Sequence, residues 1–253
     1  MGQPMLAALR SMGLRAKGFD VLEKDSDWIT TDSARFGNDL RTLISVVRDI
    51  DQTEDVLFGA QNFVATAPKL ERIIISSTLS PRYVRDLRAR IPEHIVMIDA
   101  PMSGAQIAAE RAELSFMLGG ENTDLDDAQM IFASMGSHFH RMGPFGAGMQ
   151  AKVLNNLLAA SHTAMTRMVL DWADDANLDE AALLALIQTS SGQNWLASGF
   201  NDIEFARDGF NENNSIGILV KDVASAIDAA PEGSDLNPVR MIQSMIRDLK
   251  PRP

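Results

Sequence analysis

The chain has 253 residues, 45% of them hydrophobic, which is enough for one large domain or two ordinary ones with real cores. Its 34 acidic and 23 basic side chains give a net charge of −11, which argues against nucleic acid or an anionic membrane as a partner, because both need a basic footprint. The absence of cysteine excludes disulfides, thiolate catalysis and zinc–thiolate sites.

Signals of membrane insertion or export are also missing. No run of apolar residues approaches the roughly 18 that a spanning helix needs. The segment Met1–Met5 lacks the basic-then-apolar pattern of a signal peptide. We therefore expect a cytoplasmic protein.

The first half of the chain predicts strands that alternate with helices. Helices are expected at residues 3–13, 53–65 and 81–90, the last one capped by Ser80 and Pro81, and strands at 17–22, 41–47, 72–76, 95–99 and 114–118. This alternation is typical of βαβ units in a mostly parallel sheet that is covered on both faces.

After Gly143 the strand signals disappear. A long helix is expected at residues 146–174, and further helical segments at 180–188, 194–206, 215–229 and 238–249. We therefore predict an α/β domain at residues 1–143 and an all-α domain at residues 144–253, with the long interdomain helix as the connection.

The most informative segment is the part of this long helix that contains Lys152, Asn155 and Asn156. Positions three and four residues apart share one helix face, so an ammonium and two carboxamides lie together. The other side is apolar, which predicts burial, and a buried lysine is usually partnered or functional. Such a lysine can exchange a proton with a hydroxyl or carbonyl oxygen that amides orient. The simpler alternative is a lysine that reaches solvent along a wet helix stripe.

Two further motifs accompany this helix. The segment Asp99–Ala105 (DAPMSGA) lies upstream, and Lys221–Asp222 follows an apolar run downstream. In this order the three motifs resemble the β-hydroxyacid dehydrogenase family, and the resemblance runs from Met1 to about Pro238. It implies a Rossmann-like domain with a parallel sheet, an all-α substrate domain and NAD(P)-dependent chemistry on a CH–OH group.

The resemblance assigns cofactor contacts to five positions in the first domain. Met1 and Gly2 match the end of the family's glycine-rich fingerprint, and Asp20 stands where the family binds the adenosine ribose. A carboxylate there accepts hydrogen bonds from the ribose hydroxyls and repels a 2′-phosphate, so NAD is expected rather than NADP. Val47 and Thr78 are the expected contacts near the nicotinamide ribose.

The family's first strand and first two glycines have no counterpart, because the sequence begins at the fifth position of the fingerprint. That strand is central in a doubly wound sheet, so its absence would expose two strand edges. Two interpretations stay open: a start that is late relative to the functional protein, or a degraded dinucleotide site. With this start we expect weak or no NAD binding, and an α/β half that depends on a partner chain, a domain swap or a replacement strand.

The resemblance also implies substrate contacts in the segment Asp99–Ala105, at the turn that follows Pro101. Ser103 and Gly104 would offer a hydroxyl and backbone amides to a substrate carboxylate. Ala105 replaces the family's second glycine. Because Ala is disfavoured at positive φ, we expect an ordinary backbone conformation at Ala105.

The helical half supplies the implied chemistry. Lys152 matches the family's general acid/base, and Asn156 matches the amide that orients the substrate hydroxyl, with Asn155 beside it. Lys221 matches a lysine near both substrate and nicotinamide, whereas Asp222 is expected to be structural.

Other polar groups have simpler explanations. Gly192–Trp195 resembles a substrate-pocket segment, although Trp195 could equally be core. The pair His138 and His140 lacks a third ligand at suitable spacing, so no metal is expected. The acidic clusters are expected to be solvated helix ends and faces: Asp124, Asp126, Asp127, Asp171, Asp174 and Asp175.

Together these features predict an NAD-dependent oxidoreductase that acts on a small anionic β-hydroxy acid or on its semialdehyde or keto acid. Imine reductases share the architecture but usually lack the helix lysine. The alternatives are a non-catalytic nucleotide- or ligand-binding relative and, third, a purely structural helical dimerisation protein. A homodimer or homotetramer through the helical domain is expected.

Overall fold

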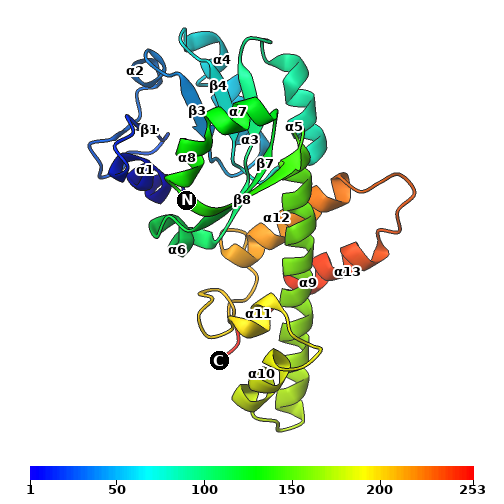
Figure 1. Ribbon diagram of the computed structural model, residues 1–253. Coiled ribbons are helices and arrows are strands. Elements are labelled where there is room, and N and C mark those ends of the chain that lie inside the picture. Colours follow the sequence, from blue (N-terminus) through cyan, green and yellow to red (C-terminus); the bar gives the residue numbers. More distant parts are fainter. The chain divides into compact units, whose positions relative to one another are not determined.

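The computed structural model describes residues 1–253. The chain forms two compact units, residues 1–152 and residues 153–253 (Figure 1). All eight strands belong to the first unit, and the second unit contains only helices and their connections. The predicted fold class, an α/β half followed by a long helix and an all-α half, is confirmed.

Six strands of the first unit form one sheet. Strands β3, β4 and β5 are parallel, whereas β7 is antiparallel to β5 and β6 and parallel to β8. Four of these strands match predicted ones, and β6 and β8 were not predicted. The order is β3 (Thr42–Ser45), β4 (Arg72–Ile75), β5 (Val96–Asp99), β7 (Leu114–Gly119) and β6 (Met102–Ser103), with β8 (Gly136–Gly143) paired to β7.

Hydrophobic cores cover both faces of the sheet. Ile73 and Ile75 of β4 belong to one core and Ile74 to the other, because successive strand side chains point to opposite faces. The first core also packs against α2 (Ser33–Gly37), α3 (Ile50–Leu57), α4 (Phe63–Thr66) and α5 (Pro81–Leu87), which the 3-10 helix η1 (Arg88–Arg90) follows. The second core includes residues of α1 (Gly2–Ser11), α6 (Ala105–Glu110), α7 (Asn122–Asp127) and α8 (Gln129–Ala133).

Local sequence explains where the helices of the first core begin and end. Ser80 Oγ accepts a hydrogen bond from the Tyr83 N–H and Pro81 occupies the first turn of α5, so the predicted cap is confirmed. The single helix predicted at 53–65 is wrong. Asn62 adopts a left-handed conformation with φ +50°, which separates α3 from α4.

Two further strands form a separate parallel pair, β1 (Gly18–Phe19) and β2 (Ile29–Thr30). The predicted strand at 17–22 is therefore shorter than expected. After Asp20 the chain is exposed, including the apolar Val21 and Leu22 at 70 and 64%, and charged residues follow from Glu23, so no buried face extends the strand.

The second unit is built around the long helix α9 (Ala147–Asp175), whose first residues belong to the first unit. The helix predicted at 194–206 is mostly wrong, because α11 ends before Gly199 and the following residues, including buried Phe205, form turns. The other helices are α10 (Glu180–Gln188), α11 (Trp195–Ser198), α12 (Ser215–Asp228) and α13 (Asn237–Arg247).

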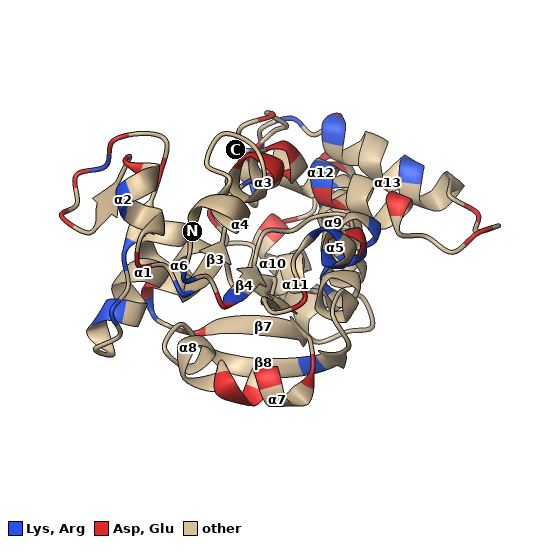
Figure 2. Cartoon of the chain, turned by 90° about the horizontal axis from the view of Figure 1, so that it is seen from above, with Lys and Arg blue, Asp and Glu red and all other residues tan.

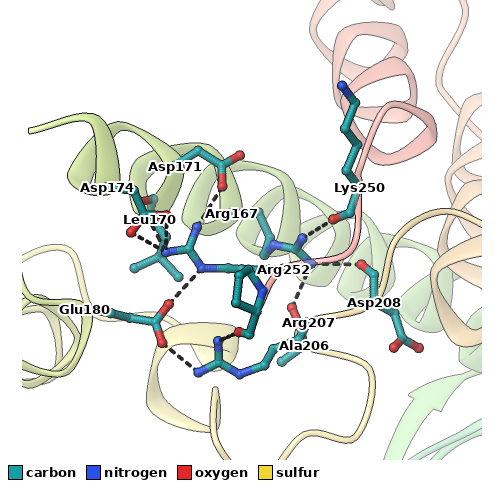
Figure 3. Close-up of polar contacts among 11 residues, drawn as sticks. Arg167, Leu170, Asp171, Asp174, Glu180, Ala206, Arg207, Asp208, Lys250 and Arg252 are labelled. Atoms are coloured by element: carbon teal, nitrogen blue, oxygen red, sulfur yellow. Dashed lines mark hydrogen bonds and ion pairs between the residues drawn. The ribbon is translucent and has the colours of Figure 1, made fainter. Parts of the chain in front are cut away.

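Three arginines bind the last residues of the chain to this unit (Figure 3). Arg167 is 2% exposed and donates to the carbonyl oxygens of Ala206, Asp208 and Lys250 at 2.8, 2.8 and 2.5 Å. Arg252 forms ion pairs with three carboxylates of α9 and α10, and Arg207 donates to one of them. These carboxylates are Asp171, Asp174 and Glu180.

Candidate active site

Lys152 and Ser103 form the centre of the candidate site in the first unit. Lys152 lies on the second turn of α9, and Ser103 ends the short strand β6. Lys152 Nζ donates a hydrogen bond to Ser103 Oγ at 3.0 Å, and Lys152 is only 7% exposed. A buried ammonium is thus held against a partly exposed hydroxyl, an arrangement that can bind an oxygen-bearing ligand and exchange a proton with it.

The turn after Ser103 differs from the expectation. Gly104 has φ +130° and Ala105 has φ +56°, so the ordinary backbone expected at Ala105 is wrong. The chain passes from β6 into α6 without an intervening loop, and this abrupt reversal uses two successive residues at positive φ. A side chain at Gly104 would meet Ala108 Cβ at 2.4 Å, so this position requires glycine.

Asp99 anchors the start of α9, and it was not among the predicted site residues. Its carboxylate is fully buried at the end of β5 and accepts hydrogen bonds from the N–H groups of Gly146 and Met149 at 2.6 and 2.5 Å. Burial raises the pKa of Asp99 to about 6, against the opposing effect of these amide hydrogen bonds. The carboxylate holds the N-terminus of α9 against β5. An acid at the end of a buried strand was the available sequence signal.

The polar residues of the second unit meet at one buried carboxylate. Asn156 Nδ2 donates to Asp222 Oδ2 at 2.5 Å, and Lys221 Nζ lies 3.1 Å from Asp222 Oδ1. Asn155 Nδ2 is 3.4 Å from Asn156 Oδ1, at the outer limit of a hydrogen bond. Asn156 also follows Lys152 by four positions on α9, so the two side chains are neighbours on one helix face.

The expected diphosphate and ribose contacts lie at the start of α1 and the end of β1. Helix α1 begins at Gly2 without a side-chain cap or an acidic residue in its first turn, and no atom would lie within 4 Å of a Cβ on Gly2. Asp20 Oδ1 accepts from the Leu22 N–H at 2.9 Å, and Asp20 Oδ2 lies 3.5 Å from Lys24 Nζ. An open helix N-terminus suits a diphosphate.

The expected nicotinamide contacts follow two neighbouring parallel strands. Val47 comes after β3 and Thr78 after β4, and the carboxyl ends of such strands meet at one edge of a sheet. At the same edge, Ser45 Oγ and Ser76 Oγ are buried without a hydrogen-bond partner. Unpartnered buried hydroxyls are typical of polar binding sites. Together with the uncapped α1, they fit a dinucleotide.

No metal site emerges. No group of three or more His, Asp or Glu side chains is arranged to hold a metal ion. Figure 2 shows the acidic positions of α7 beside β8, where Asp126 forms an ion pair with Arg141 at 2.5 Å. His138 and His140 lie on the mostly exposed strand β8. No helix in the chain combines the length and hydrophobicity that a membrane crossing requires.

The segment 192–195 leads into α11, which begins at Trp195. Asn194 caps this helix by accepting from the Ala197 N–H at 3.0 Å, and it also accepts from Thr166 Oγ1 at 3.1 Å. Trp195 is 46% exposed and contacts the Phe205 ring with centroids 6.0 Å apart. A structural role therefore accounts for Asn194, whereas Trp195 is not core.

Two family models match nearly the whole chain. Residues 1–143 match the NAD binding domain of 6-phosphogluconate dehydrogenase. Residues 146–249 match the NAD-binding domain of NADP-dependent 3-hydroxyisobutyrate dehydrogenase.

Individual relatives agree with these matches. The L-threonate dehydrogenase of Cupriavidus necator is 29% identical over 200 residues, which are 78% of this chain and 67% of that protein. The mitochondrial 3-hydroxyisobutyrate dehydrogenase of Rattus norvegicus is 27% identical over 244 residues, 91% of this chain and 73% of that protein. The solved 3-hydroxyisobutyrate dehydrogenase of Mycobacterium tuberculosis with L-serine has a TM-score of 0.82 and 25% identity, and the match covers 99% of this chain and 92% of that one.

Proposed function

Because this chain belongs to the β-hydroxyacid dehydrogenase family, we propose that it oxidises the hydroxyl of a small β-hydroxy acid, or reduces the corresponding semialdehyde or keto acid. NAD(P)-dependent oxidoreduction of a CH–OH group is the activity of the family. The names of the relatives make 3-hydroxyisobutyrate, L-threonate and L-serine the first candidate substrates.

The hydrogen bond between Lys152 and Ser103 carries this proposal. In the oxidation, Lys152 in its neutral form accepts the proton of the substrate hydroxyl while the carbon–oxygen double bond forms. In the reduction, the ammonium returns that proton to the carbonyl oxygen. A bound nicotinamide would supply the hydride acceptor for the oxidation and the hydride donor for the reduction.

The remaining site residues bind and orient the substrate. The Ser103 hydroxyl and the backbone at Gly104 bind the substrate carboxylate. Asn156 orients the substrate hydroxyl, and its neighbour Asn155 supports this contact. Lys221 supplies local positive charge for an anionic substrate and for the cofactor, in a protein whose overall net charge is −11.

The cofactor would lie along the carboxyl edge of the sheet in the first unit. Met1 and Gly2 would bind the diphosphate, Asp20 the adenosine ribose, and Val47 and Thr78 the nicotinamide ribose. Because Asp20 would repel a 2′-phosphate, we propose NAD as the preferred cofactor. A cytoplasmic location remains a prediction from the sequence.

A non-catalytic relative is the alternative function. The buried contact between Lys152 and Ser103 favours the enzyme, because burying an ammonium without using it would be costly. Incubation of the protein with NAD⁺ and each candidate hydroxy acid, followed by the appearance of NADH, tests the proposal. Turnover of at least one hydroxy acid is expected at a high NAD⁺ concentration, which compensates for the weak NAD binding expected from the sequence. Measurable NADH binding without turnover of any candidate would instead support the non-catalytic relative.

An exposed apolar stripe on α9 supports the proposed homodimer or homotetramer. Leu154, Leu158, Met165 and Trp172 are 53, 60, 46 and 64% exposed. The last three recur every seven residues, a spacing typical of a helix that pairs with another helix. A second copy of the chain offers the same stripe, so a two-fold axis can bury both.

Sedimentation of the wild type and of the double variant Leu158→Glu/Met165→Glu tests this assembly. We expect an oligomer for the wild type and a monomer for the variant. Leu186→Glu, at a position on α10 that is 58% exposed, is the matched control and should leave the oligomer intact. A monomeric wild type, or an oligomer that survives the double substitution, would refute the proposed interface.

A further inference from the structure

Asp222 lies between two residues that the proposed function places at the substrate. It is 2% exposed on α12; Oδ2 accepts a hydrogen bond, whereas Oδ1 accepts none and has an ion-pair contact alone. Oδ2 accepts from Asn156 Nδ2 at 2.5 Å, and Oδ1 lies 3.1 Å from Lys221 Nζ. One buried carboxylate therefore links the amide of α9 to the ammonium of α12.

The charge of this carboxylate fixes the orientation of the Asn156 amide. An ionised carboxylate only accepts hydrogen bonds, so Asn156 must present its NH₂ group to Asp222. The reverse orientation would set the amide oxygen against a carboxylate oxygen and leave a buried donor unused. Asn156 is itself 8% exposed, so water is a poor substitute for this partner.

Orientation matters because the two ends of a carboxamide have opposite hydrogen-bonding character. With one amide hydrogen bound to Asp222, the second hydrogen and Oδ1 of Asn156 have fixed directions. The Asn155 contact to Oδ1 at 3.4 Å is too long to fix the amide by itself. Catalysis is sensitive to such placement, and a misplacement of about 1 Å can cost about 100-fold in rate.

We propose that Asp222 is a positioning residue, which fixes the amide orientation of Asn156 and the position of the Lys221 ammonium through its two carboxylate oxygens. This inference rests on the proposed function, and it gives Asp222 a role beyond the structural one expected from the sequence. Asp222 acts through its neighbours and need not touch the substrate.

A double-mutant cycle with Asp222→Asn and Asn156→Ala tests the link to catalysis, using the hydroxy acid that the wild type turns over. Asn keeps the shape of Asp, but its NH₂ group would face either the Asn156 NH₂ group or the Lys221 ammonium, and both of these are hydrogen-bond donors. Asp222→Asn should lower kcat/KM by about 10- to 100-fold in the wild type, and by a clearly smaller factor once Asn156 is Ala, because only the Lys221 contact is then left to lose. Equal effects in both backgrounds would overturn the proposal.

NMR of the side-chain amides gives a readout that does not depend on activity. In the wild type, one amide proton of Asn156 should resonate downfield of those of exposed Asn155 and exchange slowly, because it binds a buried carboxylate. The Asn156→Ala variant assigns the signal. This measurement on the wild type also covers the case in which Asp222→Asn fails to fold. An Asn156 signal that resembles that of Asn155 would contradict the proposal.

Asp228→Asn is the matched control, because Asp228 is an exposed carboxylate near the end of the same helix. It should leave kcat/KM and the Asn156 signal unchanged. If no hydroxy acid is turned over, the proposed function fails, and the NMR result still decides whether Asp222 orients Asn156. If turnover is present but the cycle is additive, only the positioning role fails.

Discussion

Lys152 Nζ donates a hydrogen bond to Ser103 Oγ at 3.0 Å, although 49 positions separate the two residues in the chain. The carboxylate of Asp99 fixes the geometry of this contact. It binds the N-terminus of α9, which carries Lys152, to the end of β5, and the chain continues from β5 into β6, which carries Ser103. The proposed acid/base and the proposed carboxylate-binding turn are thus attached to one rigid framework.

Replacing Ala105 by Gly should stabilise the first unit. Ala105 has φ +56°, a left-handed conformation that glycine adopts at lower cost, so the free energy of unfolding should rise by about 1 kcal/mol. Urea denaturation measures the change. The matched control, Ala108→Gly, lies inside α6 and should lower the free energy of unfolding by about 0.5–1 kcal/mol. A loss of stability in Ala105→Gly would contradict the strain assigned to this turn.

The stability of the wild type relative to Asp99→Asn should depend on pH. The folded-state pKa of Asp99 is about 6, above the ordinary value of 3.8, so the folded protein binds this proton more tightly than the unfolded chain. The stability from proton binding is present below about pH 4 and is lost as the pH rises through about 6. The free energy of unfolding that is lost over this pH range is about 3 kcal/mol at most.

Urea denaturation of both proteins between pH 4 and pH 7 measures this difference, because asparagine does not titrate and contributions from other groups largely cancel. The wild type should lose stability relative to Asp99→Asn up to about pH 6 and show a constant difference above about pH 7. A relative stability that rises with pH over the lower range would refute the raised pKa.

Asp20→Ala should weaken the discrimination between NADH and NADPH. Removing the carboxylate removes its repulsion of the 2′-phosphate, so the ratio of the two dissociation constants should fall by about fivefold, equivalent to about 1 kcal/mol between close charges in water. Titrations followed by cofactor fluorescence measure both constants. Asp27→Ala, in the same exposed segment, should leave the ratio unchanged. Tighter binding of NADPH than of NADH to the wild type would count against the assignment of Asp20.

Arg167→Met should destabilise the second unit by about 3 kcal/mol, because three carbonyl oxygens, of which that of Ala206 is buried, lose a charged donor. Urea denaturation followed by tryptophan fluorescence measures the change, because two of the three tryptophans, Trp172 and Trp195, lie in this unit. The exposed Arg240 provides the control, since Arg240→Met should change stability by less than about 0.5 kcal/mol. Equal stabilities of the two variants would show that the Arg167 contacts contribute little.

The sequence predicted the elements whose apolar pattern is long or continuous. The run Ile73–Ile75 gave β4 because both of its faces are buried, and the extended apolar pattern gave α9. Strand β8 was missed because most of its residues are exposed, so no alternation marks it. The segment 194–206 misled because its buried Phe200 and Phe205 resemble a helix pattern, although turns carry them into two separate cores.

Site residues that belong to a sequence motif could be predicted. Roles that depend on a contact between distant residues could not. Lys152 and Ser103 belong to motifs that can be recognised along the chain. The positive φ of Ala105 depends on the abrupt passage from β6 to α6, which composition does not reveal. The roles of Asp99 and Asp222 depend on partners about 50 to 70 positions away, which no local pattern specifies.

Turnover of the wild type beside Lys152→Ala tests the central claim most directly. As the general acid/base, Lys152 should account for about 100- to 10,000-fold in kcat, while the dissociation constant for NADH stays nearly unchanged. Lys69→Ala, which removes an exposed lysine of the same unit, should retain full turnover. A Lys152→Ala protein that turns over the hydroxy acid at the wild-type rate would contradict the account.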